Sequence, residues 1–184
     1  LYYYISLSYE GLDRIAEAIH SMQTALSQAE RQVRELRSPT EKQLRLRYLV
    51  ETHFHLARLY HKTKQDSSAV EHLMAAQFSG GTDARFLFKL GSTYQQVKCP
   101  TRALECLCGA LAGEEGTDLF PSIPLPPREQ ILVHIALAHW CLRDHGAAME
   151  NLREAWAMGL PPLLGWESLG FLALTAEEWS IALH

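Results

Sequence analysis

The chain has 184 residues, of which 47% are hydrophobic, so it is long enough to bury the core of one domain. Its formal net charge of -4 argues against nucleic-acid or membrane-surface binding through a basic face. No apolar run approaches the roughly 20 residues of a membrane span, and no secretory signal is visible, so we expect an intracellular protein, cytoplasmic or nuclear.

The first predicted elements form an extended helical hairpin over residues 12–62. Helix-forming residues dominate 12–37 and 40–62, and both stretches are predicted as single long helices. Between them, Ser38-Pro39-Thr40-Glu41 has the form of a capping box with proline at the first helical position. The hairpin is rich in charge, and we expect it to be a solvated surface, with a second docking surface as the alternative.

The later elements are punctuated by glycine and proline. Gly80-Gly81 is predicted to end one helix, and Pro100 to begin another. The segment 114–127 reads EEGTDLFPSIPLPP and predicts a Pro-rich loop that folding does not require. Thr175-Ala176-Glu177-Glu178 is predicted to start the last helix.

One pattern recurs along the whole chain. Each copy contains a small residue directly after an apolar one, and an aromatic residue three positions after the small one. Counted from the same small residue, alanine follows at twelve positions, a large apolar residue at sixteen and a second alanine at nineteen. The second and third copies are 34 residues apart. The copies read Ile5, Ser6, Tyr9, Ala18, Met22, Ala25; Leu56, Ala57, Tyr60, Ala69, Leu73, Ala76; Leu90, Gly91, Tyr94, Ala103, Leu107, Ala110; Ile135, Ala136, His139, Ala148, Leu152, Ala155; and, in part, Trp166, Leu169, Gly170, Ala182.

Small residues facing large ones allow two antiparallel helices to approach closely. On these residues the chain resembles the tetratricopeptide repeat (TPR) family, although copies one and two are 51 residues apart, copies three and four 45 apart, and His139 replaces the usual tyrosine. The resemblance implies an all-α, right-handed superhelical solenoid of about five hairpins. It implies one array over 1–184, with repeats at about 1–37, 50–81, 84–115, 129–161 and a truncated 163–184. Because both ends cut the pattern, we expect a fragment of a longer protein.

The resemblance also implies a protein–protein interaction scaffold that binds a partner peptide or helix in a concave groove. The signature residues already supply a core, so aromatic residues elsewhere on the first helices are predicted to be exposed as anchors. In the family, certain positions of each first helix line the groove. The residues at the equivalent repeat positions of this chain are the candidate partner-binding residues Phe54, Arg58, His61, Arg85, Phe88, Lys89, Ser92, Val133, Trp140 and Phe171. The same phase places Tyr3, Tyr4 and Leu7, and Glu51 and His55, on this face.

Other functions are less well supported by the residues. The nine histidines include no His-Glu-x-x-His arrangement, so we expect polar helix surface and no metal, cofactor or catalytic site. Cys106 and Cys108 are two apart on a helix, which predicts one in the core and one partly exposed. Three of the five residues that clamp chaperone C-terminal tails in the family are absent, which argues against that ligand. The alternative function is a structural spacer or regulatory segment that acts by end-to-end contact or self-association.

Overall fold

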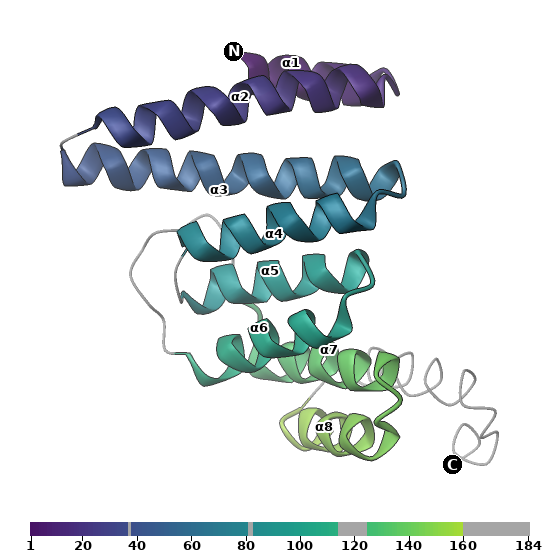
Figure 1. Ribbon diagram of the computed structural model, residues 1–184. Coiled ribbons are helices and arrows are strands. Elements are labelled where there is room, and N and C mark those ends of the chain that lie inside the picture. Colours follow the sequence, from purple (N-terminus) through teal and green to yellow (C-terminus); the bar gives the residue numbers. More distant parts are fainter. Residues whose placement is uncertain (37, 81–82, 114–124, 160–184) are drawn as a thin grey trace.

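A computed structural model describes residues 1–36, 38–80, 83–113 and 125–159, which form eight helices and no strand (Figure 1). The helices are α1 Tyr2–Gly11, α2 Ile15–Glu35, α3 Pro39–Lys62, α4 Asp66–Gly80, α5 Ala84–Gln96, α6 Pro100–Ala112, α7 Arg128–Cys141 and α8 His145–Ala157. Each odd-numbered helix packs on the next even-numbered one, and the four hairpins stack in chain order. The predicted all-α solenoid is confirmed. The predicted repeat at 163–184 lies outside the described residues.

Helix boundaries follow the capping signals closely. α3 begins at Pro39 and α6 at Pro100, each with proline in the first turn, and α4 ends at Gly80, all as predicted. The Ser38 side chain makes no capping hydrogen bond, so the capping box is only partly realised. The first long helix begins at Ile15 rather than at residue 12, because the chain turns over residues 12–14.

The turn inside each hairpin has one repeated geometry. Asp13, Lys64, Lys98 and Arg143 stand at equivalent positions and have φ values of 57°, 60°, 58° and 63°. The backbone N–H of the next residue donates to the carbonyl oxygen five positions back, as from Cys99 to Tyr94 at 2.9 Å. This left-handed conformation is one that glycine adopts without strain, yet none of the four residues is glycine. The common geometry shows that the four hairpins share one phase.

The signature residues form the core, as the pattern predicts. In the third copy Leu90, Tyr94 and Leu107 are fully buried, and in the second copy Leu56 and Leu73 are too. At Gly91 a Cβ atom would lie 2.7 Å from Cγ of Leu107, so only glycine allows α5 and α6 to approach this closely. The core therefore runs continuously from hairpin to hairpin.

α2 and α3, which face each other across the first and second hairpins, extend beyond their neighbours. α2 has 21 residues and α3 has 24, whereas α1 has 10 and α4 has 15. As a result, the carboxyl-terminal end of α2 and the amino-terminal end of α3 project past α1 and α4 (Figure 1). From the helix lengths we assign residues 27–35 and 39–47 to this projection. We call this projection the overhang. None of the described helices is both long enough and apolar enough to cross a membrane.

Part of the predicted Pro-rich loop belongs to the fold. Residues 114–124 lie outside the described residues, but Leu125 packs partly against the central core and Pro127 immediately precedes α7. The Arg128 guanidinium donates a hydrogen bond to the carbonyl oxygen of Leu111 at the end of α6. The prediction that folding does not require this loop stays a prediction, although Leu125 packs partly against the core.

Candidate functional site on the face of the first helices

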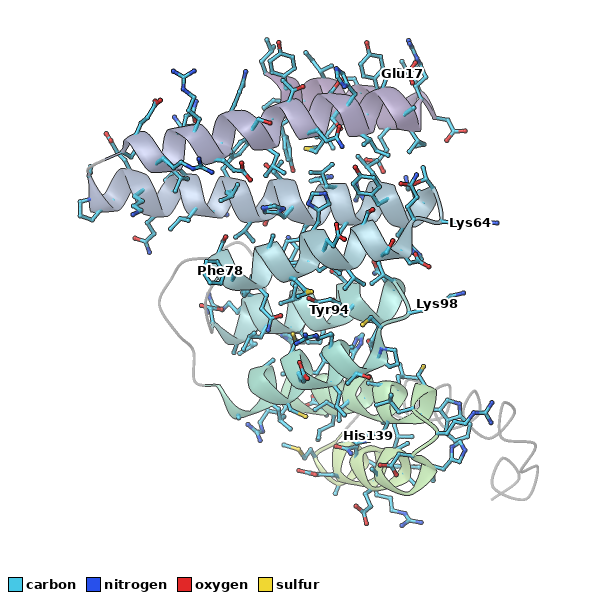
Figure 2. The ribbon with its side chains drawn as sticks, in the orientation of Figure 1. Glu17, Lys64, Phe78, Tyr94, Lys98 and His139 are labelled. Atoms are coloured by element: carbon cyan, nitrogen blue, oxygen red, sulfur yellow. The ribbon has the colours of Figure 1, made fainter. Side chains whose placement is uncertain are left out.

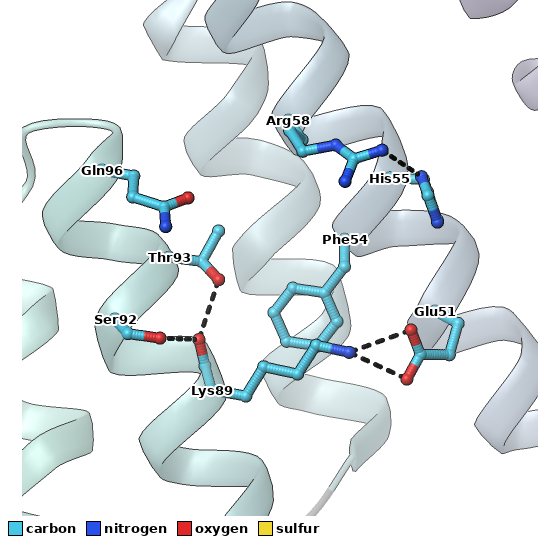
Figure 3. A pocket seen from close by; sticks show the side chains of 8 residues that line it. All are labelled: Glu51, Phe54, His55, Arg58, Lys89, Ser92, Thr93 and Gln96. Atoms are coloured by element: carbon cyan, nitrogen blue, oxygen red, sulfur yellow. Dashed lines mark hydrogen bonds and ion pairs between the residues drawn. The ribbon is translucent and has the colours of Figure 1, made fainter. Parts of the chain in front are cut away.

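A pocket lies between α3 and α5, the first helices of the second and third repeats (Figure 3). Its volume is about 330 Å³. It is lined by Glu51, Phe54, His55, Arg58, Lys89, Ser92, Thr93 and Gln96. The structure thus brings together four predicted site residues, Phe54, Arg58, Lys89 and Ser92. Thr93 and Gln96 were missed because they stand one position past the groove positions of the family and only the packing of α5 beside α3 turns them into the pocket.

Phe54 forms the floor of this pocket and is not an exposed anchor. Its side chain is only 6% exposed and belongs to the central core. Its ring meets the ring of Phe86 edge-on at 5.9 Å between centroids. The prediction that Phe54 is surplus to the core is therefore wrong, because α5 packs across it and brings Phe86 against its ring.

Lys89 covers the other side of Phe54. Its Nζ lies 4.7 Å from the centre of the Phe54 ring and donates to both carboxylate oxygens of Glu51 at 2.9 Å. A cation held both by an aromatic face and by a carboxylate is well stabilised. Lys89 and Glu51 thus form a neutral pair across the mouth of the pocket, joining α5 to α3.

Arg58 forms the cationic end of the pocket. Its Nη2 donates to Oε2 of Glu10 at 2.7 Å and lies 3.2 Å from Nδ1 of His55. Lys62 binds the other oxygen of Glu10. Burial would raise the pKa of Glu10, but the hydrogen bond from Lys62 and the charge of Arg58 lower it overall. Burial and the charge of Arg58 lower the pKa of His55, so the imidazole is neutral near pH 7.

The contact between Phe54 and Lys89 is one of three related contacts along this face. Tyr3 meets His55 with ring centroids 4.9 Å apart, and Phe88 meets His134 at 5.1 Å. The aromatic residue always stands three positions before the small signature residue of its repeat. The basic residue stands two positions before the small signature residue of the next repeat. We call the three contacts the aromatic–basic ladder. The ladder places a side chain of the next repeat against each aromatic ring.

The last contact of the ladder is reinforced by an amide. Gln95 donates from Nε2 to the carbonyl oxygen of His134 at 2.7 Å, and its Oε1 lies 2.7 Å from Nδ1 of His134. The Nδ1–H tautomer of the imidazole is the one that donates to Oε1. Burial lowers the pKa of His134, which keeps the ring neutral. Gln95 therefore joins α5 to α7 much as Lys89 and Glu51 join α3 to α5.

The remaining predicted site residues do not line the pocket. Phe88, Val133 and Arg85 are half-buried on the same series of helices. His61 is paired with Asp66 at 2.7 Å in the turn of the second hairpin. Trp140 packs on the core of the fourth hairpin, and its ring meets that of His145 at a tilt, with centroids 4.2 Å apart. The prediction that Trp140 is surplus to the core is therefore wrong. Phe171 lies outside the described residues.

Two predictions about side chains elsewhere have opposite outcomes. Cys106 is buried and Cys108 is exposed, as predicted. His53, in contrast, is only 6% exposed, and its Nδ1 lies 3.1 Å from Nδ1 of His72 on α4. Burial and the nearby His72 lower the pKa of His53 to about 4. The expectation of polar helix surface is wrong at this position, because α4 packs over it. Among the described residues no group of three His, Cys, Asp or Glu side chains could hold a metal ion.

The comparisons with known proteins rest on structure. No protein-family model and no curated protein matches the chain. A putative kinesin light chain from Podosopora anserina with nearly identical TPR-like repeats is similar, with a TM-score of 0.64 and 19% identity over 99% of this chain and 88% of that one. PilW, a widely conserved type IV pilus biogenesis factor, matches with a TM-score of 0.61 and 15% identity over 98% and 71%. MamA matches at 0.58 and 17% over 97% and 88%. The chain has the fold of TPR arrays.

Proposed function

We propose that the chain is a protein–protein interaction scaffold that binds an extended peptide or a helix of a partner protein on the face of its first helices. The observation that carries the proposal is the pocket between α3 and α5, where side chains from two repeats converge around Arg58. Repeat arrays of stacked hairpins present extended surfaces to other chains. On the same grounds we propose a binding module and not an enzyme.

The charge around the pocket suggests an acidic ligand. Arg58, Lys62 and Lys89 carry three positive charges, and Glu10 and Glu51 carry two negative ones, which leaves one positive charge in excess. Arg58 is 47% exposed, so part of its guanidinium can still donate to a ligand carboxylate. The hydroxyl and amide groups of Ser92, Thr93 and Gln96 add hydrogen-bonding groups on the opposite wall. We therefore propose a ligand that places a carboxylate at Arg58 and polar backbone along α5.

Binding can be tested with peptides selected from a random display library. Selected peptides should be enriched in Asp and Glu, and their affinity should fall at least about tenfold when Arg58 is replaced by Gln. Gln96→Trp, an exposed position at the pocket, should block the same peptides by filling the space. Phe54 is left intact because its replacement would disturb the core.

The matched control is Arg102→Gln, which removes an exposed arginine from α6 on the opposite side of the third hairpin. Circular dichroism verifies that each variant is folded. Peptides that bind the Arg58 and Gln96 variants as tightly as the original chain, while Arg102→Gln weakens them, would place the binding surface on the second helices and contradict the proposal. The absence of nucleic-acid and membrane ligands and an intracellular location remain predictions from the sequence.

A further inference from the structure

The second helices expose an apolar pair that the core does not use. Phe78 on α4 is 94% exposed, more than any other large hydrophobic side chain in the described part of the chain, and Met74, one turn earlier, is 46% exposed. Cys108 and Ala112 stand 34 residues later on α6 and are also exposed. Met74 and Phe78 are large apolar side chains exposed one turn apart, which is typical of an interaction surface, and Cys108 and Ala112 add smaller apolar groups at the equivalent positions of α6. We call these four residues the apolar patch.

Carboxylates recur at one repeat position of the second helices, and two of them lie one turn before residues of the apolar patch. Glu71 lies one turn before Met74, and Glu105 and Glu150 occupy the same repeat position on α6 and α8. All three are exposed, and Glu105 is bound by Arg102 of its own helix at 3.1 Å. The patch thus combines apolar anchors with a row of negative charge, and its occupant must supply an apolar side chain next to positive charge.

The overhang of this same chain has that composition. Leu44 is 66% exposed near the start of α3, and Lys42 and Arg45 on either side of it are exposed as well. Arg34 adds a further exposed positive charge from α2. The overhang also holds Glu30, Glu35 and Glu41, so its five basic residues leave two positive charges in excess. This net positive charge and the exposed Leu44 are complementary to the apolar patch and its acidic border.

The overhang and the apolar patch are also placed so that two copies of the chain can cover each other's surfaces. α3 and α4 run antiparallel, so Phe78, near the carboxyl-terminal end of α4, lies at the end of the array from which the overhang projects (Figure 2). A two-fold axis at this end would let the overhang of each copy cover the patch of the other at the same time. Two identical contacts made together give a closed dimer instead of an open filament.

We propose that a second copy of this chain binds the apolar patch through its overhang, and that the chain forms a two-fold dimer by this reciprocal contact. The chain should sediment as a dimer at low ionic strength and shift toward monomer as salt is raised, since screening weakens the charged border. Phe78→Ser should raise the dissociation constant at least about tenfold, because it removes the central anchor. Because Phe78 is almost fully exposed, circular dichroism should show the variant folded as before.

Charge exchange tests the direct pairing of the two surfaces. Glu71→Lys with Glu105→Lys, and Lys42→Glu with Arg45→Glu, should each give monomers. All four changes in one chain should restore the dimer, because attraction is re-established with reversed signs. Leu142→Ser is the matched control, since Leu142 is an exposed apolar residue (40%) in the turn between α7 and α8, away from both surfaces. The proposal is overturned if the unmodified chain is monomeric at low salt and several hundred micromolar, or if the quadruple variant stays monomeric.

Discussion

The second repeat (α3 and α4) and the third (α5 and α6) have the same signature 34 residues apart, yet they differ in how they use equivalent positions. Phe54 is a core residue, whereas its counterpart Phe88 is half-buried. His53 and His72 form a buried polar pair, whereas the third repeat has Leu87 and Cys106 in their places. The repeat position decides which side of a helix faces inward, but the neighbouring hairpin decides how completely each side chain is covered.

The two phenylalanines show the reason. The first helix of the next repeat, α5, places Phe86 5.9 Å and Lys89 4.7 Å from the ring of Phe54, and Glu51 binds Lys89. For Phe88, the first helix of the next repeat is α7, and its His134 ring lies 5.1 Å from the Phe88 ring. Position 86 of the third repeat is aromatic, and the equivalent position of the fourth repeat is Ile131. The covering of each aromatic ring thus depends on the sequence of the next repeat.

The largest expected effect is a difference between two alanine substitutions. Phe54→Ala should lower the free energy of unfolding by about 3–4 kcal/mol, because it empties a buried site in the core. Phe88→Ala should lower it less, by about 1–2 kcal/mol, since that ring is only partly buried against the core. Urea titration of both variants, followed by circular dichroism, measures the difference. Equal losses would show that the two junctions between repeats are packed alike.

Inside the hairpins, Gly91 distinguishes the third repeat from the second, which has Ala57 in its place. Gly91→Leu should lower the free energy of unfolding by about 2–3 kcal/mol, because even a Cβ atom would meet Leu107 at 2.7 Å. Gly91→Ala should cost less, since only one methyl group must be accommodated. A thermal melt that is the same for Gly91→Leu as for the original chain would show that the helices of this hairpin do not pack as described.

The histidine pair should make the second repeat sensitive to acid. The pKa of His53 is lowered to about 4 from an unfolded value near 6.5, so between these pH values the unfolded chain binds more protons than the folded one. The contribution of His53 to the free energy of unfolding should therefore be complete above about pH 6.5 and fall by about 3 kcal/mol as the pH drops to 4. The test is denaturant unfolding at a series of pH values.

Replacing the histidine pair of the second repeat by the equivalent residues of the third tests whether this pair causes the acid sensitivity. His53→Leu together with His72→Cys should remove most of the acid dependence, whereas His20→Gln, at an exposed position, should leave it unchanged. The smaller dependence that remains comes from His55 and His134, whose pKa values burial also lowers. An unchanged pH profile in the double variant would assign the acid sensitivity to another part of the fold.

The smallest expected effect concerns the signature tyrosines. The hydroxyl of Tyr60 accepts a hydrogen bond from Nε2 of Gln23 at 2.7 Å, whereas the buried hydroxyl of Tyr94 has no hydrogen-bond partner among the described residues. Tyr94→Phe should therefore raise the free energy of unfolding by up to about 1 kcal/mol, and Tyr60→Phe should lower it by about 0.5 kcal/mol. Paired urea titrations measure both changes. A loss of stability in Tyr94→Phe would mean that its hydroxyl is hydrogen-bonded in solution.

Much of the candidate site could be inferred from repeat position alone. Arg58, Lys89 and Ser92 line one pocket, as their common face predicts. The partners of these residues could not be predicted in the same way. Glu10, which binds Arg58, is 48 positions away on α1, and the stack of α1 on α3 brings the two together. Phe54 was misjudged because a pattern within one helix contains no information about the ring that the next hairpin places against it.

The sequence by itself determined the helical hairpins, their phase and the signature residues of the core, because helix period, capping residues and the alternation of small and large side chains act locally or between neighbouring helices. Only the tertiary structure decided which polar groups meet. The Lys89–Glu51 pair, the His53–His72 pair and the aromatic–basic ladder each join residues from different helices, and each depends on distances of a few ångströms. Electrostatic and aromatic contacts change strongly over such distances, whereas the burial of apolar surface does not.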